Sequence, residues 1–460
     1  MRNANTSAIL ALANGMESGA IDPRRLVEQT LTAIGQTDPA IFTLVTADRA
    51  RREASGSAER RSHGHVIGPL DGVPIAWKDL FDLEGFVTKA GSRVLDDGPA
   101  KADAPVVSAL AAAGMVTVGR VNMTEFAYSG IGLNPHYGTP INPHGLTPRV
   151  PGGSSSGSAV AVARGLTPAA IGTDTGGSVR IPAAFTGVVG YKSSAGRYPM
   201  SGAFPLSRTL DTLGVFAGAV ADAILVDAAM RGVTPTLPAP AIVDGLRIFA
   251  PTNVVLYDCE AEVLANFEAS LAALKAAGVV IERKPFPIFD EIMALHKVFG
   301  TLAAHEAYAL HRERIEAGAA TQMDRRVVAR ILSATKLDPN GLPKLLEARR
   351  DLIARAIAAC GDGFVAYPTV AHVAPSIAAI EEDDEAFVQM NAKTLRNTML
   401  GNMLDWCGVS LPNGFGFEAM PTGFLLSGMP GDDDRLLAAA LAIEEIFVSR
   451  AAPVQFSTRK

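Results

Sequence analysis

Short β-favouring runs along this chain are followed by stretches in which apolar residues recur at helical spacing. After Asp22 and Pro23, which suit a helix cap and a first helical position, apolar residues return at this spacing as far as Ile34. Residues 73–77 and 116–118 are instead short apolar runs rich in β-favouring side chains. This alternation of strand and helix predicts an α/β architecture.

The same patterns predict the further elements of the chain. We expect helices over residues 49–61, 103–113, 156–165, 179–184, 261–277 and 436–448, and strands over 169–171, 188–191, 246–249, 279–281 and 364–368. Asp103 is the expected N-cap of the second of these helices, and Gly114 follows its end. Residues 288–358 are mostly helical in pattern, and we expect them to shape a substrate pocket.

Length and composition bear on how these elements are grouped. The chain has 460 residues, whereas a single core usually stops growing at roughly 250–300 residues, so length alone suggests two or three domains. No shift in composition and no low-complexity linker marks a boundary. We therefore predict one unit over residues 1–460, with a helical segment at 1–64, a catalytic core at 65–215 and the rest of the sheet, with a pocket insertion, at 216–460.

Charge and cysteine content narrow the class of protein. A net charge of −6 without a long basic run argues against direct nucleic-acid binding. The chain has no run of 18 apolar residues, so no membrane span is predicted. Residues 1–12 do not have the pattern of a secretion signal. The three cysteines, Cys259, Cys360 and Cys407, are far apart and odd in number, as expected in a reducing cytoplasm. The acidic run 381–385 suits a solvated loop or a helix start better than a metal site.

Candidate chemistry gathers in residues 151–183, where glycine and serine form two clusters at 152–157 and 176–178. Glycine adopts backbone conformations that other residues avoid, so successive N–H groups can point at one spot and stabilise a developing anion. Serine is the one nucleophilic residue type present in both clusters. The pattern therefore indicates acyl transfer through a serine ester.

The segment GTDTGGSVRIPA at 172–183 resembles the most specific part of the amidase signature family. That family also has a lysine in the context GVP-x-x-x-K-D, which GVPIAWKD at 72–79 supplies, and the spacing of Ser154 and Ser178 matches that of its two serines. The resemblance runs from about residue 26 to about residue 447. It implies one α/β/α unit around a large twisted mixed sheet with helices on both faces, and it implies no metal and no organic cofactor.

The resemblance also implies a catalytic triad of Lys78, Ser154 and Ser178. Ser178 would attack the amide carbonyl, and Ser154, behind a cis peptide bond from Gly153, would relay the proton to Lys78. Lys78 must then be neutral, so its pKa must fall well below roughly 10.4, and burial is the available cause. In an arbitrary protein a lysine at a strand end is more often a surface residue, but the motif favours the catalytic interpretation.

The oxyanion hole implied by the resemblance consists of the backbone N–H groups of Thr175, Gly176, Gly177 and Ser178. Glycines belong in such a loop because they let the main chain approach the developing charge closely. Water would then cleave the acyl-enzyme.

Further residues have supporting roles in this interpretation. Tyr128 and Ser129 lie in a glycine-rich loop, in a region that the family uses for substrate contact. Asp174 and Arg180 flank the nucleophile turn, and we expect them to pin it rather than to react. Ser155 is the expected supporting hydrogen-bond partner.

Other chemistries fit the sequence less well. Residues 153–157 match G-x-S-x-G, which would make Ser155 the nucleophile, but that elbow needs a preceding strand and none is predicted. His305 and His311 do not form H-E-x-x-H, and the first cluster lacks the G-K-[ST] ending of a phosphate loop. His136 suits a hydrogen-bonded loop histidine better than a catalytic residue.

We therefore predict an amidohydrolase that acts on a small-molecule amide, without nucleic acid or membrane, and leave a homodimer open. The alternative is the glutaminase component of a glutamyl-tRNA(Gln) amidotransferase, its A subunit, which belongs to the same family. That component typically has glutamine where Ile181 stands, and its C-terminal region differs from residues 394–428, which favours a free-standing hydrolase. A catalytically inactive binding module is a third option, against which the intact Lys78, Ser154 and Ser178 argue.

Overall fold

A single sheet of 11 strands runs through the computed structural model, which describes residues 7–451. The strands lie in the order β1-β3-β2-β4-β6-β5-β10-β11-β9-β7-β8. Their bounds are β1 (Phe42–Val45), β2 (Pro74–Lys78), β3 (Val116–Val121), β4 (Ala169–Asp174), β5 (Val189–Lys192), β6 (Thr212–Ala217), β7 (Arg247–Pro251), β8 (Val280–Lys284), β9 (Phe364–Pro368), β10 (Cys407–Phe415) and β11 (Pro421–Gly428).

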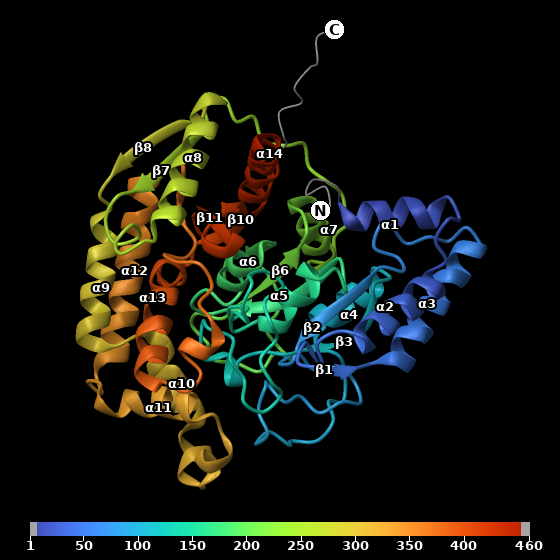
Figure 1. Cartoon of the computed structure of the whole chain (residues 1–460), viewed down its shortest axis with the longest axis horizontal. Coiled ribbons are helices and arrows are strands. Elements are labelled where there is room, and N and C mark those ends of the chain that lie inside the picture. Colours follow the sequence, from blue (N-terminus) through green and yellow to red (C-terminus); the bar gives the residue numbers. More distant parts are fainter. Residues whose placement is uncertain (1–6, 452–460) are drawn as a thin grey trace.

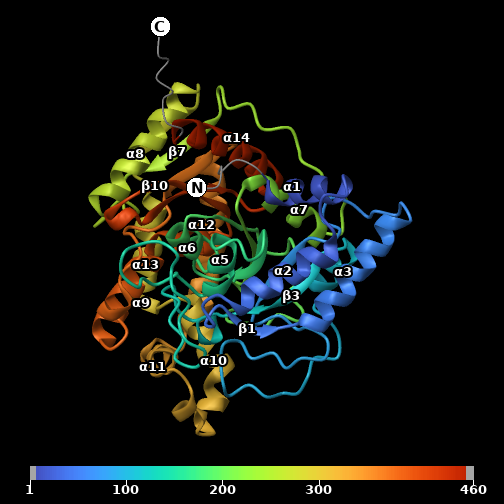
Figure 2. The ribbon, with the colours of Figure 1, turned by 45° about the vertical axis from the view of Figure 1, so that its right-hand side comes forward.

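Helices cover both faces of this sheet (Figure 1). They are α1 (Ala8–Glu17), α2 (Pro23–Gly35), α3 (Ala47–Ser62), α4 (Pro105–Ala112), α5 (Ser156–Ala163), α6 (Arg180–Thr186), α7 (Val220–Met230), α8 (Ala261–Ala276), α9 (Pro287–Phe299), α10 (Leu302–Glu316), α11 (Arg325–Ser333), α12 (Gly341–Cys360), α13 (Asp384–Met403) and α14 (Asp433–Ala451). In Figures 1 and 2 the helices α1–α3 lie at one side of the molecule and α9–α11 at the other.

The sheet is mixed, as predicted. Strand β2 is parallel to both β3 and β4, and β9, β7 and β8 are parallel to one another at the other end. The strands between these groups pair antiparallel. Because β2 and β4 are parallel neighbours, their carboxyl ends meet at the same edge of the sheet, and the predicted chemistry lies at these two ends.

Alternation along the strands builds a separate core on each face. In β2, the side chains of Ile75 and Trp77 join one buried cluster and that of Ala76 joins another. In β7, the side chains of Ile248 and Phe249 likewise join different buried clusters. Successive residues of a strand point to opposite faces, so an apolar run such as 73–77 indicates a strand that is covered on both sides.

The predicted helices and strands are confirmed, with one correction at a helix start. Asp103 is not the N-cap of α4, because the helix begins at Pro105 and Ala104 is its cap. The Asp103 carboxylate instead accepts two hydrogen bonds of 2.7 Å from Arg49 and one of 2.8 Å from the Glu84 N–H. The Asp103 carboxylate thus forms a long-range ion pair and does not cap α4, which is the role that the local pattern predicts.

The sequence patterns do not predict the central hairpin of β10 and β11. Pro412, Gly414 and Gly423 interrupt its alternation, and the pairing register shifts between Pro412 and Gly414. The hairpin is nevertheless buried in the middle of the sheet, because β5 and β9 pair with its two outer edges.

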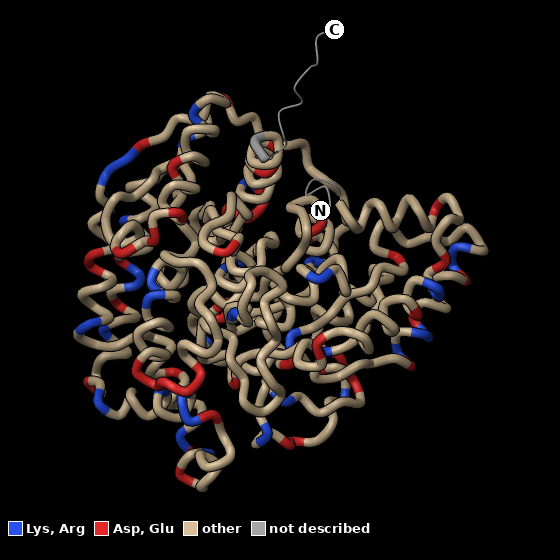
Figure 3. Tube along the Cα trace, viewed as in Figure 1, with Lys and Arg blue, Asp and Glu red and all other residues tan. Residues whose placement is uncertain are grey.

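The distribution of charge and apolar residues is that of a chain folded around an internal core. Figure 3 shows acidic and basic residues interspersed around the periphery, while the centre of the view is mostly uncharged. The acidic run 381–385 is exposed, and Asp383 caps α13, as the sequence predicts. Between residues 7 and 451, no helix combines the length and the apolarity needed to cross a bilayer.

The buried hairpin generates a stability prediction. Phe424 is fully buried against the rings of Phe267 and Phe447, so Phe424→Ala should lower the free energy of unfolding by about 3–5 kcal/mol in a urea titration. Phe415 lies in the same hairpin but is 63% exposed, and Phe415→Ala should cost less than about 0.5 kcal/mol. Equal losses in the two variants would contradict a hairpin buried in the core.

Candidate active site

The carboxyl end of β2 brings Lys78 next to the end of β4. Pairing of Trp77 with Ile171 sets this register, and it places the Lys78 amine 2.8 Å from the Thr173 Oγ1 atom. The same amine lies 2.7 Å from the Ser154 Oγ atom. Lys78 and Ser154 are fully buried. The structure therefore unites two of the three predicted triad residues in one hydrogen-bonded group.

Ser154 enters this group from the turn that precedes α5. The peptide bond between Gly153 and Ser154 is cis, as the resemblance implies. The turn is packed closely, since a Cβ atom on Gly153 would lie 2.7 Å from the backbone nitrogen of Gly132. A side chain at position 153 would therefore displace the backbone that presents Ser154 to Lys78.

Ser178 follows β4 and lies at the wall of a cavity, with 4% of its surface exposed. Its Oγ atom has no hydrogen-bond partner within residues 7–451, so no hydrogen bond joins it to Ser154 in this structure. Its carbonyl accepts a 3.3 Å hydrogen bond from the Ser155 N–H. The Ser178 hydroxyl is thus unengaged and turned to the space where a substrate would bind.

Burial controls the charge of the lysine. It lowers the pKa of Lys78 to about 7, against the opposing effect of the negative charges of Asp211 and Asp174. A substantial fraction of the amine is therefore neutral at physiological pH. Burial likewise raises the pKa of Asp211 to about 6, although hydrogen bonds from Thr175, Leu206 and Ser207 stabilise its ionised form.

Asp174 and Arg180 form a buried clamp around the turn of Ser178. Arg180 donates to the two Asp174 carboxylate oxygens over 2.8 and 3.0 Å, and Asn402 contacts both residues. Burial opposes ionisation of Asp174, but the Arg180 charge outweighs it and holds the pKa of the carboxyl well below its usual range. This geometry supports the pinning role that the sequence predicts for the pair.

The clamp leaves fewer free N–H donors for the predicted oxyanion hole. The Gly177 N–H donates to the Asp174 Oδ1 atom over 2.9 Å, so it is already engaged and not free for a substrate oxygen. The N–H groups of Thr175, Gly176 and Ser178 have no acceptor within the described residues. Gly177 still has to be glycine, because its φ is +134° and a Cβ atom would lie 2.1 Å from the Thr398 Oγ1 atom.

The cavity at Ser178 consists of two connected parts that share five lining residues. The inner chamber has a volume of about 60 Å³ and includes Ser178, Thr175, Gly176, Tyr128 and Ser129 in its wall. The outer chamber has a volume of about 640 Å³ and lies among α9, α11 and α13. The residues common to both are His296, Thr301, Arg330, Leu395 and Met399. We call them the neck.

Tyr128 and Ser129 lie in the inner wall, as expected of substrate-contacting residues. The Tyr128 ring packs under the Arg330 guanidinium, with 4.2 Å from the guanidinium carbon to the ring centroid. Ser129 donates to the Asn391 Oδ1 atom over 3.0 Å and accepts from the Ile131 N–H. Their contacts connect the loop of Tyr128 and Ser129 to α11 and α13, two of the helices that line the outer chamber.

The other candidate residues lie apart from this wall. The Ser155 hydroxyl donates to the Thr173 carbonyl over 3.3 Å, and no strand precedes it, so the nucleophile-elbow pattern is not formed. His136 contacts the buried Glu125, and His305 lies 2.8 Å from the Phe299 carbonyl. Among residues 7–451 no group of histidine, cysteine, aspartate or glutamate is arranged to hold a metal ion.

Several residues of the site are missing from the sequence prediction, namely Thr173, Asp211, Arg330, Asn391, Thr398 and Asn402. Three of them form a polar stripe on α13, where Asn391, Thr398 and Asn402 are buried. Thr398 donates to the Gly176 carbonyl over 2.6 Å, and Asn402 supports the Asp174 clamp. Polar residues that recur at helical spacing along residues 391–402 are the signal that could have found these three.

Comparison with known proteins shows the family to which this chain belongs. The family model described as Amidase matches residues 25–437, and the chain belongs to this family. It is 34% identical to the 2-amino-5-chloromuconic acid deaminase of Comamonas testosteroni, over 92% of this chain and 94% of the relative. It is 32% identical to the A subunit of the glutamyl-tRNA(Gln) amidotransferase of Cupriavidus necator, over 96% of both chains.

A solved structure supports the same fold. It belongs to a protein complex described as vestigial, which reveals the origins of an s-triazine catabolic enzyme, and it superposes with a TM-score of 0.84 at 30% identity over 95% of this chain and 97% of that one. Family membership and these relatives support hydrolysis of a C–N bond in an amide.

The clamp generates a prediction that concerns stability. Asp174→Asn removes the charge that balances the buried Arg180, so the free energy of unfolding should fall by about 3–5 kcal/mol in a urea titration. Asp48, whose side chain is 91% exposed, provides the matched control, and Asp48→Asn should leave stability unchanged within the precision of the titration. A stable Asp174→Asn variant would show that Arg180 does not depend on this carboxylate.

Proposed function

We propose that the protein hydrolyses a carboxylic amide of a small linear substrate through a serine acyl-enzyme, with Ser178 as nucleophile, Ser154 as proton relay and Lys78 as base. The observation that carries the proposal is the fully buried Lys78 amine, with a pKa lowered to about 7, within 2.7 Å of the Ser154 hydroxyl beside the cavity of Ser178. Serine hydroxyls are weak nucleophiles at neutral pH and need such a base.

In the first step the Ser178 Oγ atom forms a bond to the carbonyl carbon. Its proton passes to the Ser154 Oγ atom while the Ser154 proton passes to the neutral Lys78 amine. The tetrahedral intermediate then breaks its C–N bond, and the leaving nitrogen takes a proton from Ser154, which Lys78 replaces. Every proton taken up is returned, so Lys78 is neutral again when the acyl-enzyme has formed.

The negative carbonyl oxygen would be held by the unengaged N–H groups of Thr175, Gly176 and Ser178. A single donor of this kind typically contributes about 2.7–4 kcal/mol to lowering the barrier. The Asp211 carboxylate accepts a hydrogen bond from the Thr175 hydroxyl and so fixes one end of the loop that carries these N–H groups. The Asp174 clamp fixes the other end. A water molecule then attacks the acyl group, by the same proton path, and frees Ser178.

The second candidate is the glutaminase component of a glutamyl-tRNA(Gln) amidotransferase, favoured by the 32% identity to the A subunit of such an enzyme over 96% of both chains. Ile181 and the 394–428 region argue for the free-standing hydrolase. The two functions share the catalytic group, and they differ in whether the chain works without partner proteins.

The purified chain, assayed alone with a panel of short aliphatic amides, should release ammonia. Ser178→Ala should lower the rate at least about 10³-fold, because the loss of a serine nucleophile can cost about 10⁶ in kcat. A sulfonyl fluoride should label Ser178, as located by peptide mass spectrometry.

Thr147 is a serine-like hydroxyl residue outside both chambers, and Thr147→Ala should retain full activity as the matched control. Labelling of Ser155 would refute the assignment of the nucleophile. Glutamine hydrolysis that requires added partner proteins would favour the second candidate.

The protonation of Lys78 predicts a pH profile. The base acts when neutral, so kcat/KM should fall about tenfold per pH unit below the Lys78 pKa of about 7 and level off above it. The negative charge of Asp211 raises the Lys78 pKa, so Asp211→Asn should move the acidic limb to lower pH. A profile that stays flat from pH 5 to 9, or a limb that moves to higher pH in Asp211→Asn, would contradict Lys78 as the base.

A further inference from the structure

Arg330 on α11 is the one charged side chain among the described residues that line the inner chamber at neutral pH. The other titratable groups in that wall are His296 and Tyr128. Burial lowers the pKa of His296 to about 4 and raises the pKa of Tyr128, so both are neutral at pH 7. The chamber in which Ser178 stands thus has a single positive charge at its neck.

This arginine has no carboxylate partner within residues 7–451, although its side chain is half-buried. Its guanidinium lies over the Tyr128 ring at 4.2 Å, and Nη1 donates to the Tyr128 carbonyl over 3.1 Å. The contacts with Tyr128 hold the group in place but do not occupy all five of its N–H donors. A planar guanidinium fixed in this way is suited to bind a carboxylate through its remaining N–H groups.

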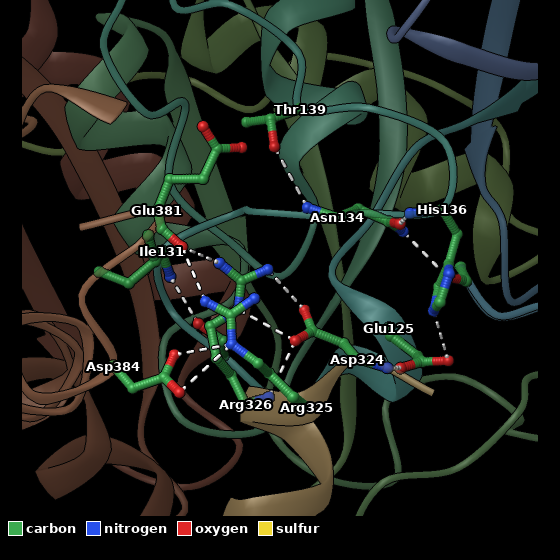
Figure 4. A network of polar contacts seen from close by, with 12 residues as sticks. Glu125, Ile131, Asn134, His136, Thr139, Asp324, Arg325, Arg326, Glu381 and Asp384 are labelled. Atoms are coloured by element: carbon green, nitrogen blue, oxygen red, sulfur yellow. Dashed lines mark hydrogen bonds and ion pairs between the residues drawn. The ribbon is translucent and has the colours of Figure 1, made fainter. Parts of the chain in front are cut away.

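Hydrogen bonds and ion pairs attach α11, the helix that carries Arg330, to Glu125 and to α13 (Figure 4). The buried Glu125 accepts a 2.6 Å hydrogen bond from the Asp324 N–H, and the Asp324 side chain caps α11 and pairs with Arg326. Arg325 connects the same end of α11 to Asp384 of α13 at 3.1 Å. The position of Arg330 is therefore set by the core and does not depend on a loose surface segment.

A second donor faces the outer chamber near the same place. The Asn391 Oδ1 atom accepts from the Ser129 hydroxyl and from the Gly130 N–H, which fixes its amide orientation. Its Nδ2 group then has no acceptor among the described residues, although Asn391 is only 6% exposed. An oxygen-rich anionic group would satisfy this donor.

The remaining charged residues of the outer chamber do not cancel the charge of Arg330. Arg326 pairs with Asp324, Lys393 pairs with Asp258, and Asp384 pairs with Arg325. Arg396 also lines this chamber and makes no ion pair among the described residues. The path to Ser178 is thus positively charged, which favours the entry of anions.

We propose that the substrate is a short amide that carries a carboxylate, which Arg330 binds at the neck while the reacting amide lies at Ser178. This proposal rests on the proposed function and names its substrate class. Arg330 and Ser178 both line the inner chamber, whose volume is about 60 Å³, so the carboxylate and the reacting amide lie in one small space. The carboxylate is therefore only a short chain away from the scissile carbonyl.

The test compares isosteric pairs of amides that differ in charge. Malonamate is paired with acetoacetamide and succinamate with levulinamide, so that a methyl ketone replaces the carboxylate, and ammonia release is measured. The protein should favour the anionic member at least tenfold in kcat/KM. Arg330→Gln should lower this ratio about 10- to 100-fold, as expected for a hydrogen-bonded charge pair, and Arg330→Lys should lower it less.

Arg350 on α12 provides the matched control, because it is exposed and lines neither chamber. Arg350→Gln changes the net charge by the same amount and should leave the ratio unchanged. A protein that favours the neutral amides, or an Arg330→Gln variant that keeps the ratio of the unaltered chain, would overturn the proposal.

Failure of the proposed function would be recognised separately, since then no amide of either kind would be hydrolysed. In that case the substrate class would be tested by measuring the binding of malonate and succinate by calorimetry. Arg330→Gln should weaken the binding at least tenfold, and Arg350→Gln should not weaken it. Absence of binding to the unaltered chain, or equal binding to the Arg330→Gln variant, would overturn the carboxylate site.

Discussion

The removal of one lysine amine from water is the constraint on which the rest of this site depends. The charged form of Lys78 loses its hydration in the core, so the neutral form becomes accessible near pH 7, where an exposed lysine would be protonated. Neighbouring charged groups also influence whether this amine is protonated. Asp174 would favour the charged amine, but Arg180 and Asn402 already satisfy that carboxylate, and they direct it to the nucleophile turn. The same contacts therefore stabilise the loop and limit the influence of its negative charge on the base.

Much of this arrangement could be predicted from local sequence. A buried strand that ends in Lys78, a helix that follows the first serine cluster and a strand that leads into the second cluster all have short-range signals, and the structure confirms these elements. Local reasoning failed where a distant partner decided the outcome. Asp103 pairs with the distant Arg49 instead of capping α4. The Gly177 N–H donates to the nearby Asp174, which the distant Asn402 helps to orient, instead of staying free for a substrate. The hairpin of β10 and β11 was missed because its proline and glycines interrupt the strand pattern.

The substrate side of the site could not be predicted, because it is assembled from segments far apart in the chain. The neck combines His296 of α9, Arg330 of α11 and Met399 of α13, and the loop of Tyr128 lines the inner chamber beside it. None of these positions has a local signature, and their meeting depends on contacts such as that of Glu125 with the start of α11, which no periodicity reveals. The proposed catalytic residues are thus encoded in two short motifs, whereas the chamber proposed to select the substrate is a property of the whole fold.

The ionisation of Lys78 can be measured without substrate. In ¹³C NMR of protein labelled at the lysine Cε position, the Lys78 resonance is the one that disappears in the Lys78→Met variant. The account predicts that this resonance titrates near pH 7. A midpoint near the ordinary lysine value of roughly 10.4 would show that the amine is protonated at working pH and would contradict the proposed proton path.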